Sequence, residues 1–482
     1  MRAYSPSIAL LTSLLLAGGC ARAPADRNPV ELTVATDLDP DPDVVEVELV
    51  AALGTKEYLD GKPAEVWGYR DGGRRGSKVT VPGPLIETKQ GDLLVVRVRN
   101  ELPEATTVHW HGLRLPAAQD GTNTAQLPIM PGETFEYRFV VNDPGSYWYH
   151  PHMRGDVQIE NGLYAPLIVR GGIEPEVAAD RYFVLDDVKL DGDGTLVDAP
   201  TALDLMVGRQ GNVVLVNGVR GASIDVARGS RERWRFVNAA NGRFFNLSLP
   251  GVSFLVIGWD GGVIAEPYSV DTLLIAPGER YEVLVDLDLA AGASPALQTL
   301  FYDRGHSLPD PGPIDLLRLD VGKSGLAPPA LPTVWADVPP IAVTTSSAIR
   351  AFVLTEIEDT GNGQPMFMIN GEAWPFNNPI SANLGATEIW EIRNDAEMDH
   401  PFHLHGMFFQ VLNRNGVPET RLGWKDTVLV PQLSTVRFAV TYTAPGMWMY
   451  HCHILEHAEL GMMGTLMVGP MSMAASAGHA HQ

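Results

Sequence analysis

Hydrophobic and polar residues alternate along most of the chain from about residue 44 onward, in short runs separated by glycine and proline. A period of two is typical of strands that bury one face. The 48 glycines and 37 prolines follow no short period, which excludes a collagen-like repeat and indicates many turns between strands. The pattern predicts an all-β protein and disfavours a helical bundle.

One β unit occurs three times along the chain. Ten-residue segments that run from glycine to asparagine stand at residues 91–100 (GDLLVVRVRN), 229–238 (GSRERWRFVN) and 385–394 (GATEIWEIRN). A second strand, entered through a proline, follows each segment, at Pro131, Pro277 and Pro431. A chain of 482 residues is long enough for three domains. The repeats predict three Greek-key β-sandwich or barrel domains, with boundaries at 44–172, 173–330 and 331–470.

The first residues have the layout of an export signal. Arg2 precedes an apolar run from Ile8 to Leu16, and small residues lead to Cys20. We therefore expect residues 1–19 to be a signal peptide and the protein to be periplasmic or attached to the cell envelope. The ending AGGC resembles a bacterial lipoprotein cleavage box, in which Cys20 becomes lipidated, and simple secretion is the alternative. Residues 20–43 are expected to form a solvated tether and residues 471–482 a disordered tail.

The charge of the chain disfavours nucleic acid as a partner. Lys and Arg number 35 against 58 Asp and Glu, a formal net charge of −23. Binding that depends on neutralising phosphates needs the opposite sign.

Ten of the 13 histidines lie in four clusters. These clusters are His109/His111, His150/His152, His400/His403/His405 and His451/His453/His457. Side chains at i and i+2 of a strand project from one face, so each HxH unit directs two imidazoles to one place. A single such pair is as easily two buried histidines on a strand, but four pairs placed symmetrically in two repeats indicate a metal site. Eight imidazole nitrogens suit copper, zinc, nickel or iron.

The first and third repeats carry these histidines and the second does not. His109 stands eighteen residues after Gly91, and His403 stands eighteen after Gly385. The same spacing from Gly229 ends on Leu247. The outer domains are therefore expected to hold the metal chemistry.

Cys452 narrows the choice of metal. It lies between His451 and His453, so its side chain must face away from theirs on a strand. Together with His400, His457 and Met462 it forms a second candidate site. Two histidines, a cysteine and a weak axial methionine are the ligands of electron-transfer copper centres. Met463 is the alternative axial residue.

These motifs identify a family resemblance. The chain resembles the three-domain multicopper oxidases, the laccase-like enzymes, over about residues 44–470, through HWHG, HPH, HPFHLHG and HCHILEHAELGM. The resemblance implies cupredoxin-like domains, four copper ions, and a trinuclear copper cluster between the first and third domains, with the middle domain as a spacer. It places type 1 copper on His400, Cys452 and His457 with Met462 axial; type 2 copper on His109 and His403; and the type 3 pair on His111, His150, His152, His405, His451 and His453.

The resemblance also implies an activity. A small-molecule or metal-ion donor is oxidised one electron at a time at type 1 copper, electrons pass through Cys452, and dioxygen is reduced to water at the cluster. Phenolic or aromatic donors are the first expectation. A metallo-oxidase for Cu(I), Fe(II) or Mn(II) and a non-catalytic copper-binding envelope protein are the alternatives.

Oxygen reduction also consumes protons. Asp120, nine residues after His111, matches an acidic residue that related enzymes use near the cluster, although an Asp before Gly is also a common turn. Several bacterial relatives have Glu directly after the last type 1 histidine, where this chain has Ala458. Glu459 or Glu456 is expected to replace it.

Overall fold

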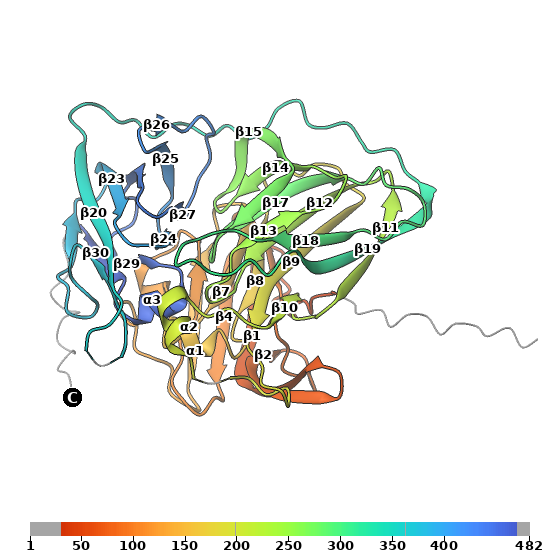
Figure 1. Cartoon of the computed structure of the whole chain (residues 1–482), viewed down its shortest axis with the longest axis horizontal. Coiled ribbons are helices and arrows are strands. Elements are labelled where there is room, and N and C mark those ends of the chain that lie inside the picture. Colours follow the sequence, from red (N-terminus) through yellow and green to blue (C-terminus); the bar gives the residue numbers. More distant parts are fainter. Residues whose placement is uncertain (1–29, 198, 362, 470–482) are drawn as a thin grey trace, which may run out of the picture.

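Six β-sheets, two for each of three domains, make up the computed structural model, which describes residues 30–197, 199–361 and 363–469. The expected signal peptide, Cys20 and the tail lie outside the described residues. In Figure 1 the third domain is blue, the middle domain green and the first domain orange. The all-β prediction is confirmed.

The first domain consists of the sheets β2-β1-β4-β6 and β3-β8-β7-β5. Its elements are β1 (Val44–Leu59), β2 (Lys62–Asp71), β3 (Ile86–Lys89), β4 (Leu93–Asn100), β5 (His109–His111), the 3-10 helix η1 (Ala117–Gln119), β6 (Thr134–Val140), β7 (Gly145–His150), α1 (Gly155–Gln158) and β8 (Ala165–Arg170).

The middle domain consists of the sheets β10-β9-β12-β17-β14-β15 and β11-β19-β18-β13-β16. Its elements are β9 (Ala179–Val188), α2 (Ala202–Val207), β10 (Val213–Val216), β11 (Ala222–Arg228), β12 (Arg231–Asn238), β13 (Phe245–Ser248), β14 (Phe254–Trp259), β15 (Gly262–Val270), β16 (Thr272–Ile275), β17 (Arg280–Asp286), β18 (Ala296–Leu300) and β19 (Ile314–Gly325).

The third domain consists of the sheets β21-β20-β23-β28-β25-β26 and β22-β30-β29-β24-β27. Its elements are β20 (Ala348–Ile357), β21 (Met366–Ile369), β22 (Ile380–Ala382), β23 (Thr387–Asn394), β24 (His400–Leu404), β25 (Phe409–Arg414), β26 (Val417–Pro418), β27 (Thr427–Val430), β28 (Thr435–Thr441), β29 (Gly446–Cys452), α3 (Leu455–Glu459) and β30 (Met463–Val468).

The repeated sequence unit occupies the same place in each domain. Strands β4, β12 and β23 each pair in parallel with the first strand of their domain, β1, β9 or β20. Each also pairs antiparallel with the strand entered through proline, β6, β17 or β28. The three repeats are therefore the central strands of three equivalent sheets.

The side chain of the asparagine that ends each repeat makes three hydrogen bonds to nearby backbone groups. The Asn394 amide donates to the carbonyl oxygens of Met398 and Val430, at 2.8 and 3.0 Å, and its oxygen accepts from the backbone N–H of Ala396 at 3.0 Å. Asn100 and Asn238 make the same three kinds of contact in their domains. The asparagine thus fixes the loop that leads into the next strand.

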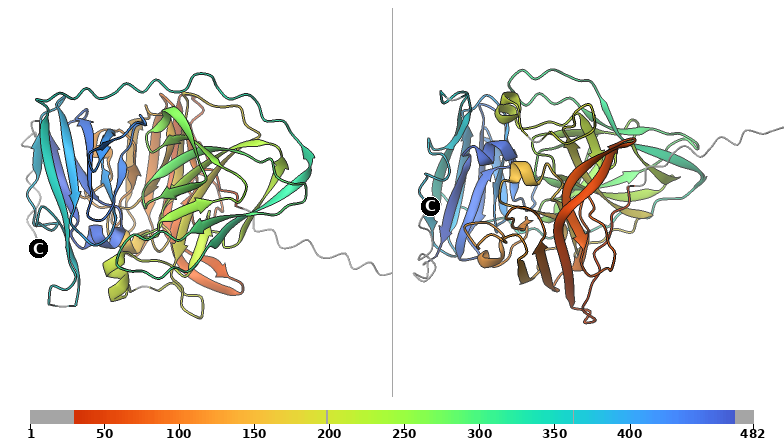
Figure 2. Two further views of the ribbon diagram at one scale, coloured as in Figure 1. Left: turned by 45° about the horizontal axis from the view of Figure 1, so that its top comes forward. Right: turned by 90° about the horizontal axis from the view of Figure 1, so that it is seen from below.

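The first and third domains share one buried core. A continuous hydrophobic cluster extends from Val45 in β1 to Val468 in β30 and includes Trp110, Trp448 and Cys452. The middle domain has a separate cluster around Trp234. The two views in Figure 2 show the first and third domains side by side. Strands of the first and third domains therefore pack against one core at this boundary.

The described part of the expected tether is attached to the domains. The backbone N–H of Ala35 donates to Leu85 at 2.8 Å, and the N–H of Leu85 donates to Thr33 at 2.7 Å. Asn217 of the middle domain donates to the carbonyl of Val30 at 2.6 Å. The described part of this segment is therefore attached to the domains by backbone hydrogen bonds, while most of its residues are exposed.

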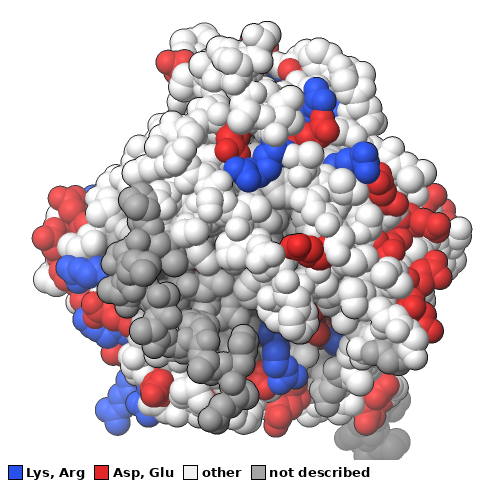
Figure 3. Space-filling model, turned by 90° about the vertical axis from the view of Figure 1, so that its left-hand side faces the viewer, with Lys and Arg blue, Asp and Glu red and all other residues white. Residues whose placement is uncertain are grey.

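Surface charge and helix length add two observations. Uncharged residues occupy most of the face seen in Figure 3, and acidic and basic side chains lie mainly toward its edge. Within the described ranges, no helix combines the length and apolar character needed to cross a bilayer.

Candidate metal centres

Four neighbouring strands position the histidine pairs. Strands β5 and β7 are adjacent in the first domain, with His109 opposite His150. Strands β24 and β29 are adjacent in the third domain, with His403 opposite His451. The two sheets meet at the shared core, so the pairs from residues far apart in the chain face one another.

One group consists of His152, His405 and His451. The Nε2 atom of His451 lies 3.0 Å from Nε2 of His405 and 3.3 Å from Nε2 of His152. The opposite nitrogens are engaged: Nδ1 of His405 donates to the Asp120 carboxylate at 2.9 Å, and Nδ1 of His451 donates to the Cys452 carbonyl at 2.8 Å. The three free nitrogens therefore converge on one point between the domains.

A second group consists of His111, His150 and His453, whose nitrogens also lie close enough to share an ion. Nδ1 of His150 donates to the carbonyl of Pro151 at 2.9 Å, and its Nε2 lies 3.5 Å from Nδ1 of His111. Both ring nitrogens of His453 are buried and have no hydrogen-bond partner within the described part of the chain.

His109 and His403 complete the arrangement. Nδ1 of His109 donates to the Asp120 carbonyl at 2.8 Å, and Nδ1 of His403 donates to the Asp426 carbonyl at 3.0 Å. The Nε2 atoms of both rings are buried and lack a partner among residues 30–469. Each ring stacks on a histidine of the other domain, His109 on His405 and His403 on His111, with centroids 4.0 and 3.9 Å apart.

A separate group consists of His400, Cys452 and His457. Nδ1 of His400 lies 3.5 Å from the Cys452 sulfur and 3.2 Å from Nδ1 of His457. The sulfur lies 3.8 Å from Nδ1 of His457. All three side chains are buried. Cys452 thus belongs to one group while His451 and His453 belong to the other, as alternation along β29 predicts.

Met462 lies close to this group and is fully buried. Its carbonyl oxygen accepts from the backbone N–H of Cys452 at 3.0 Å. Met463 packs instead with Met449 and Ala458 in a small cluster. The backbone bond places Met462 on the turn that closes over Cys452.

The chemistry of these groups fits a bound metal. A neutral imidazole that donates through one nitrogen presents a lone pair on the other. Burial, together with neighbouring imidazoles, lowers the pKa of His152 to about 3, and burial lowers the pKa of His400 to about 4. The rings are therefore neutral, and their lone pairs face one another unless a cation lies between them. Burial likewise raises the pKa of the Cys452 thiol, so a thiolate here needs a metal partner.

The middle domain is more than a spacer at these sites. Arg280 of β17 donates to both carboxylate oxygens of Asp426, each at 2.6 Å. The Asp426 carboxylate lies 3.3 Å from Nε2 of His111 and 3.4 Å from Nδ1 of His403. One arginine from the middle domain therefore holds a third-domain carboxylate against histidines of both outer domains.

Sequence reasoning missed Arg280 and Asp426. A signal was present, because the first repeat has Thr134 where the middle repeat has Arg280, and a charged residue on an inward-facing strand position needs a buried partner. The partner itself lies 146 residues away in sequence and had no signal of its own.

A middle-domain helix covers the cysteine-containing group. The Met206 carbonyl of α2 accepts from Nε2 of His457 at 3.1 Å. Helices α1, α2 and α3 lie together where the three domains meet (Figure 1). His457 is fully buried as a result.

The carboxylates named from the sequence occupy different positions. Asp120 is fully buried and contacts His405, as described above. Glu456 is also fully buried, and it accepts from Arg209 N–H at 3.0 Å and from the Asn241 amide at 2.9 Å. Glu459 lies at the surface, where one oxygen accepts from Gly155 N–H of α1 at 2.7 Å. Of the two replacements considered for the glutamate absent at Ala458, only Glu459 reaches solvent.

Comparison with known proteins establishes the family. Three family models, each described as multicopper oxidase, match residues 58–173, 188–293 and 347–472. The multicopper oxidase MmcO of Mycobacterium tuberculosis is 34% identical over 80% of this chain and 81% of its own length. The laccase of Bacillus subtilis is 27% identical, over 84% of this chain and 90% of its own. A solved structure, the multicopper oxidase from Campylobacter jejuni described as a metallo-oxidase, superposes with a TM-score of 0.80 at 28% identity, covering 91% of this chain and 94% of the other.

The chain therefore belongs to the multicopper oxidase family. Its class is that of copper-binding oxidoreductases that use dioxygen and small electron donors. The family resemblance and the cupredoxin-like fold predicted from the sequence are both confirmed.

Proposed function

We propose that this protein is an exported, laccase-like oxidase that couples one-electron oxidation of phenolic or similar aromatic donors to four-electron reduction of dioxygen to two waters. The observation that carries the proposal is the pair of buried groups joined by β29: Cys452 faces one group, and its neighbours His451 and His453 face the other. No ligand of the family pattern is replaced.

Four copper ions are proposed. The type 1 ion is assigned to His400, Cys452 and His457 with Met462 axial. The type 2 ion is assigned to His109 and His403, whose unpartnered Nε2 atoms support it. The type 3 pair is assigned to two sets of three histidines, His111/His150/His453 and His152/His405/His451, which match the observed groups.

Copper, when bound, supplies reversible one-electron storage and oxygen binding. The chain's own contribution begins with connectivity. The three residues His451, Cys452 and His453 are covalently linked, so electrons have a path of a few bonds between the two groups. The hydrogen bonds that the imidazoles donate to the Asp120 carboxylate and to backbone carbonyls, those of Asp120 and Asp426 among them, fix which nitrogen of each ring faces the metal.

Protons are assigned two carriers. One carboxylate oxygen of Asp120 accepts a hydrogen bond from His405, a histidine of the proposed cluster. The other oxygen, Oδ1, has no hydrogen-bond partner among the described residues. Glu459 connects solvent to α1, which begins three residues after His152. We propose that Asp120 holds a proton at the cluster and that Glu459 takes the place of the glutamate absent at residue 458.

Metal analysis and a visible spectrum of copper-loaded protein test the assignment. We expect four coppers for each chain, an intense blue absorption, and oxygen uptake with a phenolic donor. In Cys452→Ser the blue band should disappear and the copper content should fall to three, because a hydroxyl does not replace the thiolate. Protein that stays colourless and free of copper after loading would overturn the proposal.

The preferred electron donor distinguishes a laccase-like oxidase from a metallo-oxidase. The structural neighbour from Campylobacter jejuni is described as a metallo-oxidase, which keeps Cu(I), Fe(II) and Mn(II) in consideration. Rates of oxygen uptake with a phenol and with each ion should favour the phenol. Turnover of one ion with negligible phenol oxidation would reassign the donor, and no oxygen uptake with any donor would favour a non-catalytic copper protein.

Export completes the proposal, and it rests on the sequence of residues 1–20. Cell fractionation of the producing organism should find the mature chain in the envelope. Cys20→Ala should release it into the soluble periplasmic fraction if Cys20 is lipidated, and should leave its location unchanged if the chain is simply secreted.

A further inference from the structure

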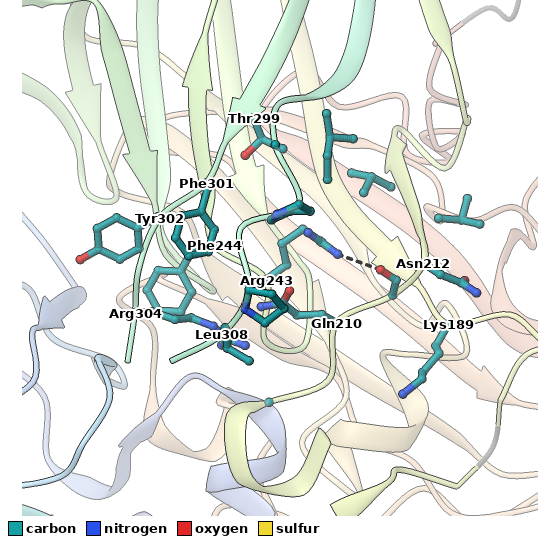
Figure 4. A pocket seen from close by; sticks show the side chains of 18 of the residues that line it. Lys189, Gln210, Asn212, Arg243, Phe244, Thr299, Phe301, Tyr302, Arg304 and Leu308 are labelled. Atoms are coloured by element: carbon teal, nitrogen blue, oxygen red, sulfur yellow. Dashed lines mark hydrogen bonds between the residues drawn. The ribbon is translucent and has the colours of Figure 1, made fainter. Parts of the chain in front are cut away.

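A large cavity lies in the middle domain, apart from the metal groups. Its volume is about 790 Å³, and it is enclosed by α2, the start of β10 and the segment that follows β18. Figure 4 shows aromatic side chains grouped on one side of the cavity and Lys189 and Asn212 on the other. The volume lies in the range of sites that bind small organic molecules.

Two segments that line this cavity contact the cysteine-containing group or the residue next to it in the chain. The α2 wall supplies the Met206 carbonyl, which accepts from His457 at 3.1 Å. In the segment that follows β18, the Tyr302 hydroxyl donates to the Asp399 carboxylate at 2.6 Å, and the Arg304 carbonyl accepts from Asp399 N–H at 2.8 Å. Asp399 is the residue before His400. The residues around the cavity are therefore linked by hydrogen bonds to His457 on one side and to the chain neighbour of His400 on the other.

The cavity is basic in an acidic protein. Its lining contains four basic side chains, those of Lys189, Arg220, Arg243 and Arg304, and two acidic ones, those of Asp204 and Asp315. The chain as a whole carries a formal charge of −23. Lys189 pairs with Asp204 and Arg243 pairs with the buried Asp187, each at 2.5 Å. The positive charge that favours an anionic occupant is therefore chiefly that of Arg304.

Arg304 is the basic side chain of the cavity on which this inference rests. It is 2% exposed, and its guanidinium donates to the Gly242 carbonyl at 2.6 Å. With the Gln210 amide turned so that its oxygen faces the guanidinium, this second neutral acceptor lies at 2.6 and 3.2 Å. No carboxylate forms an ion pair with it within the described ranges. Burial and the nearby Arg243 lower the pKa of Arg304 to about 9. A buried cation with only neutral partners is stabilised by an added anion.

An aromatic surface lies next to this charge. The rings of Phe244 and Tyr302 stack with centroids 5.8 Å apart and an interplanar angle of 22°. The Arg304 guanidinium carbon lies 5.5 Å from the centroid of Phe244. A flat ring that carries a carboxylate would match both features, with the ring against the aromatic side chains and the carboxylate toward Arg304.

We propose that this cavity is the donor site for aromatic carboxylates, such as phenols that carry a carboxylate on the ring. The inference rests on the proposed oxidase function and names the substrate class for it. Each phenol loses one electron and one proton from its O–H group and leaves as a phenoxyl radical. Four phenols supply the four electrons, and the four protons they release balance those that convert one dioxygen to two waters.

Binding is tested without turnover. The probe is 3,4,5-trimethoxybenzoate, which has no phenolic O–H to oxidise, and its neutral match is 3,4,5-trimethoxybenzamide. Calorimetric titration of copper-loaded protein should show binding of the benzoate at least ten-fold tighter than the amide. Arg304→Gln should weaken benzoate binding at least ten-fold and leave amide binding within about two-fold, because only the charge interaction is removed.

Two further variants keep the test independent of folding at the buried Arg304. Leu308→Trp leaves every charge in place and fills part of the cavity, so it should weaken both probes. Arg393→Gln, an exposed arginine in the third domain, is the matched control and should bind as the unaltered protein does. Equal affinity for benzoate and amide, or benzoate binding unchanged in both Arg304→Gln and Leu308→Trp, would overturn the proposal.

Turnover then connects the cavity to the reaction. Syringate and 2,6-dimethoxyphenol share the oxidisable ring and differ by the carboxylate. We expect a higher kcat/KM for syringate, reduced at least ten-fold in Arg304→Gln with little change for 2,6-dimethoxyphenol. Benzoate binding without oxidation of any donor would count against the oxidase and leave the cavity assignment standing. Oxidation of both donors with no preference for syringate, together with no binding of the benzoate, would overturn the cavity assignment. It would leave the proposed oxidase function standing.

Discussion

At the scale of single residues, the repeated asparagines connect sequence pattern to site geometry. Asn394 is fully buried and ties the end of β23 to the loop that carries Met398, two residues before His400. A side-chain amide can satisfy two carbonyls and one N–H at once, which no apolar residue of similar size can do. The same residue type therefore recurs at the same place in all three domains.

Replacing Asn394 by Ala should destabilise the protein. Two buried carbonyls and one N–H lose their partner, and each unsatisfied group costs about 1–3 kcal/mol, so the total loss is of the order of 3 kcal/mol after local rearrangement. The melting temperature measured by calorimetry should fall by several degrees. Asn378→Ala, at an exposed loop position, is the control. An unchanged melting temperature in Asn394→Ala would show that the loop does not need the amide.

At the scale of elements, β17 shows how a domain without metal ligands contributes to the metal centre. The strand carries Arg280 to the boundary, where the guanidinium binds Asp426 with two parallel hydrogen bonds. Asp426 precedes β27, the strand that pairs with β24 and its histidines. Because a bidentate contact fixes orientation as well as distance, Arg280 determines how Asp426 meets His111 and His403.

Arg280→Lys should therefore disturb the proposed trinuclear cluster and leave the type 1 copper site unchanged. Lysine keeps the charge but cannot form the two parallel bonds. We expect an altered electron paramagnetic resonance signal of type 2 copper, a roughly 10–100-fold loss of turnover, and an unchanged blue band. Arg280→Met should be more severe, because it leaves Asp426 buried without a counter-charge at a cost of about 3–5 kcal/mol.

The matched control for this pair is Arg437→Met, an exposed arginine on β28 that pairs with Glu391. It should leave the type 2 signal, turnover and stability near those of the unaltered protein. If the type 2 signal of Arg280→Lys were also unchanged, Arg280 would be a structural residue only.

At the scale of the whole molecule, a buried ion-pair network of the middle domain is linked to the first domain through Ser146. Ser146 of the first domain donates to Glu282 of the middle domain at 2.5 Å, and Arg235 donates to the same carboxylate at 2.8 Å. Arg233 forms a further ion pair with Glu282. Burial alone would raise the pKa of Glu282, but the two guanidinium groups outweigh it and lower the pKa to about 2.

This shift predicts an acid-sensitive contribution to stability. Because the folded-state pKa lies below the usual value of 4.5, the contribution is fully present above about pH 4.5 and is lost as the pH falls toward 2. Glu282→Gln should lower the melting temperature at pH 7, since it leaves two buried guanidinium groups short of a partner. The difference from the unaltered protein should narrow between pH 4.5 and pH 3.5. The exposed Glu136→Gln is the control, and a difference that stays constant over this range would contradict the assignment.

The sequence predicted the candidate metal ligands but not the groups that hydrogen-bond to them. The two histidines of each HxH pair have one residue between them, and Cys452 is that residue in the pair His451/His453. Alternation along a strand is therefore enough to predict which side chains share a face. Asp120 was found through the family resemblance, because it matches an acidic residue that related enzymes use near the cluster. Arg280, Asp426 and the Met206 carbonyl were not found, since a contact between distant segments leaves no local spacing to detect. The expectation that the middle domain only separates the others failed for the same reason.

The sequence by itself determined the number of domains, the strands that repeat, the residues able to bind metal and the opposite directions in which Cys452 and its neighbours point. All of these depend on the period of two along a strand and on short separations. The tertiary structure alone decided which histidines meet across domains, how the middle domain orients and covers them, and where a basic cavity adjoins the site. Those features depend on packing between surfaces far apart in the chain, and packing is fixed only when the three domains fold against one another.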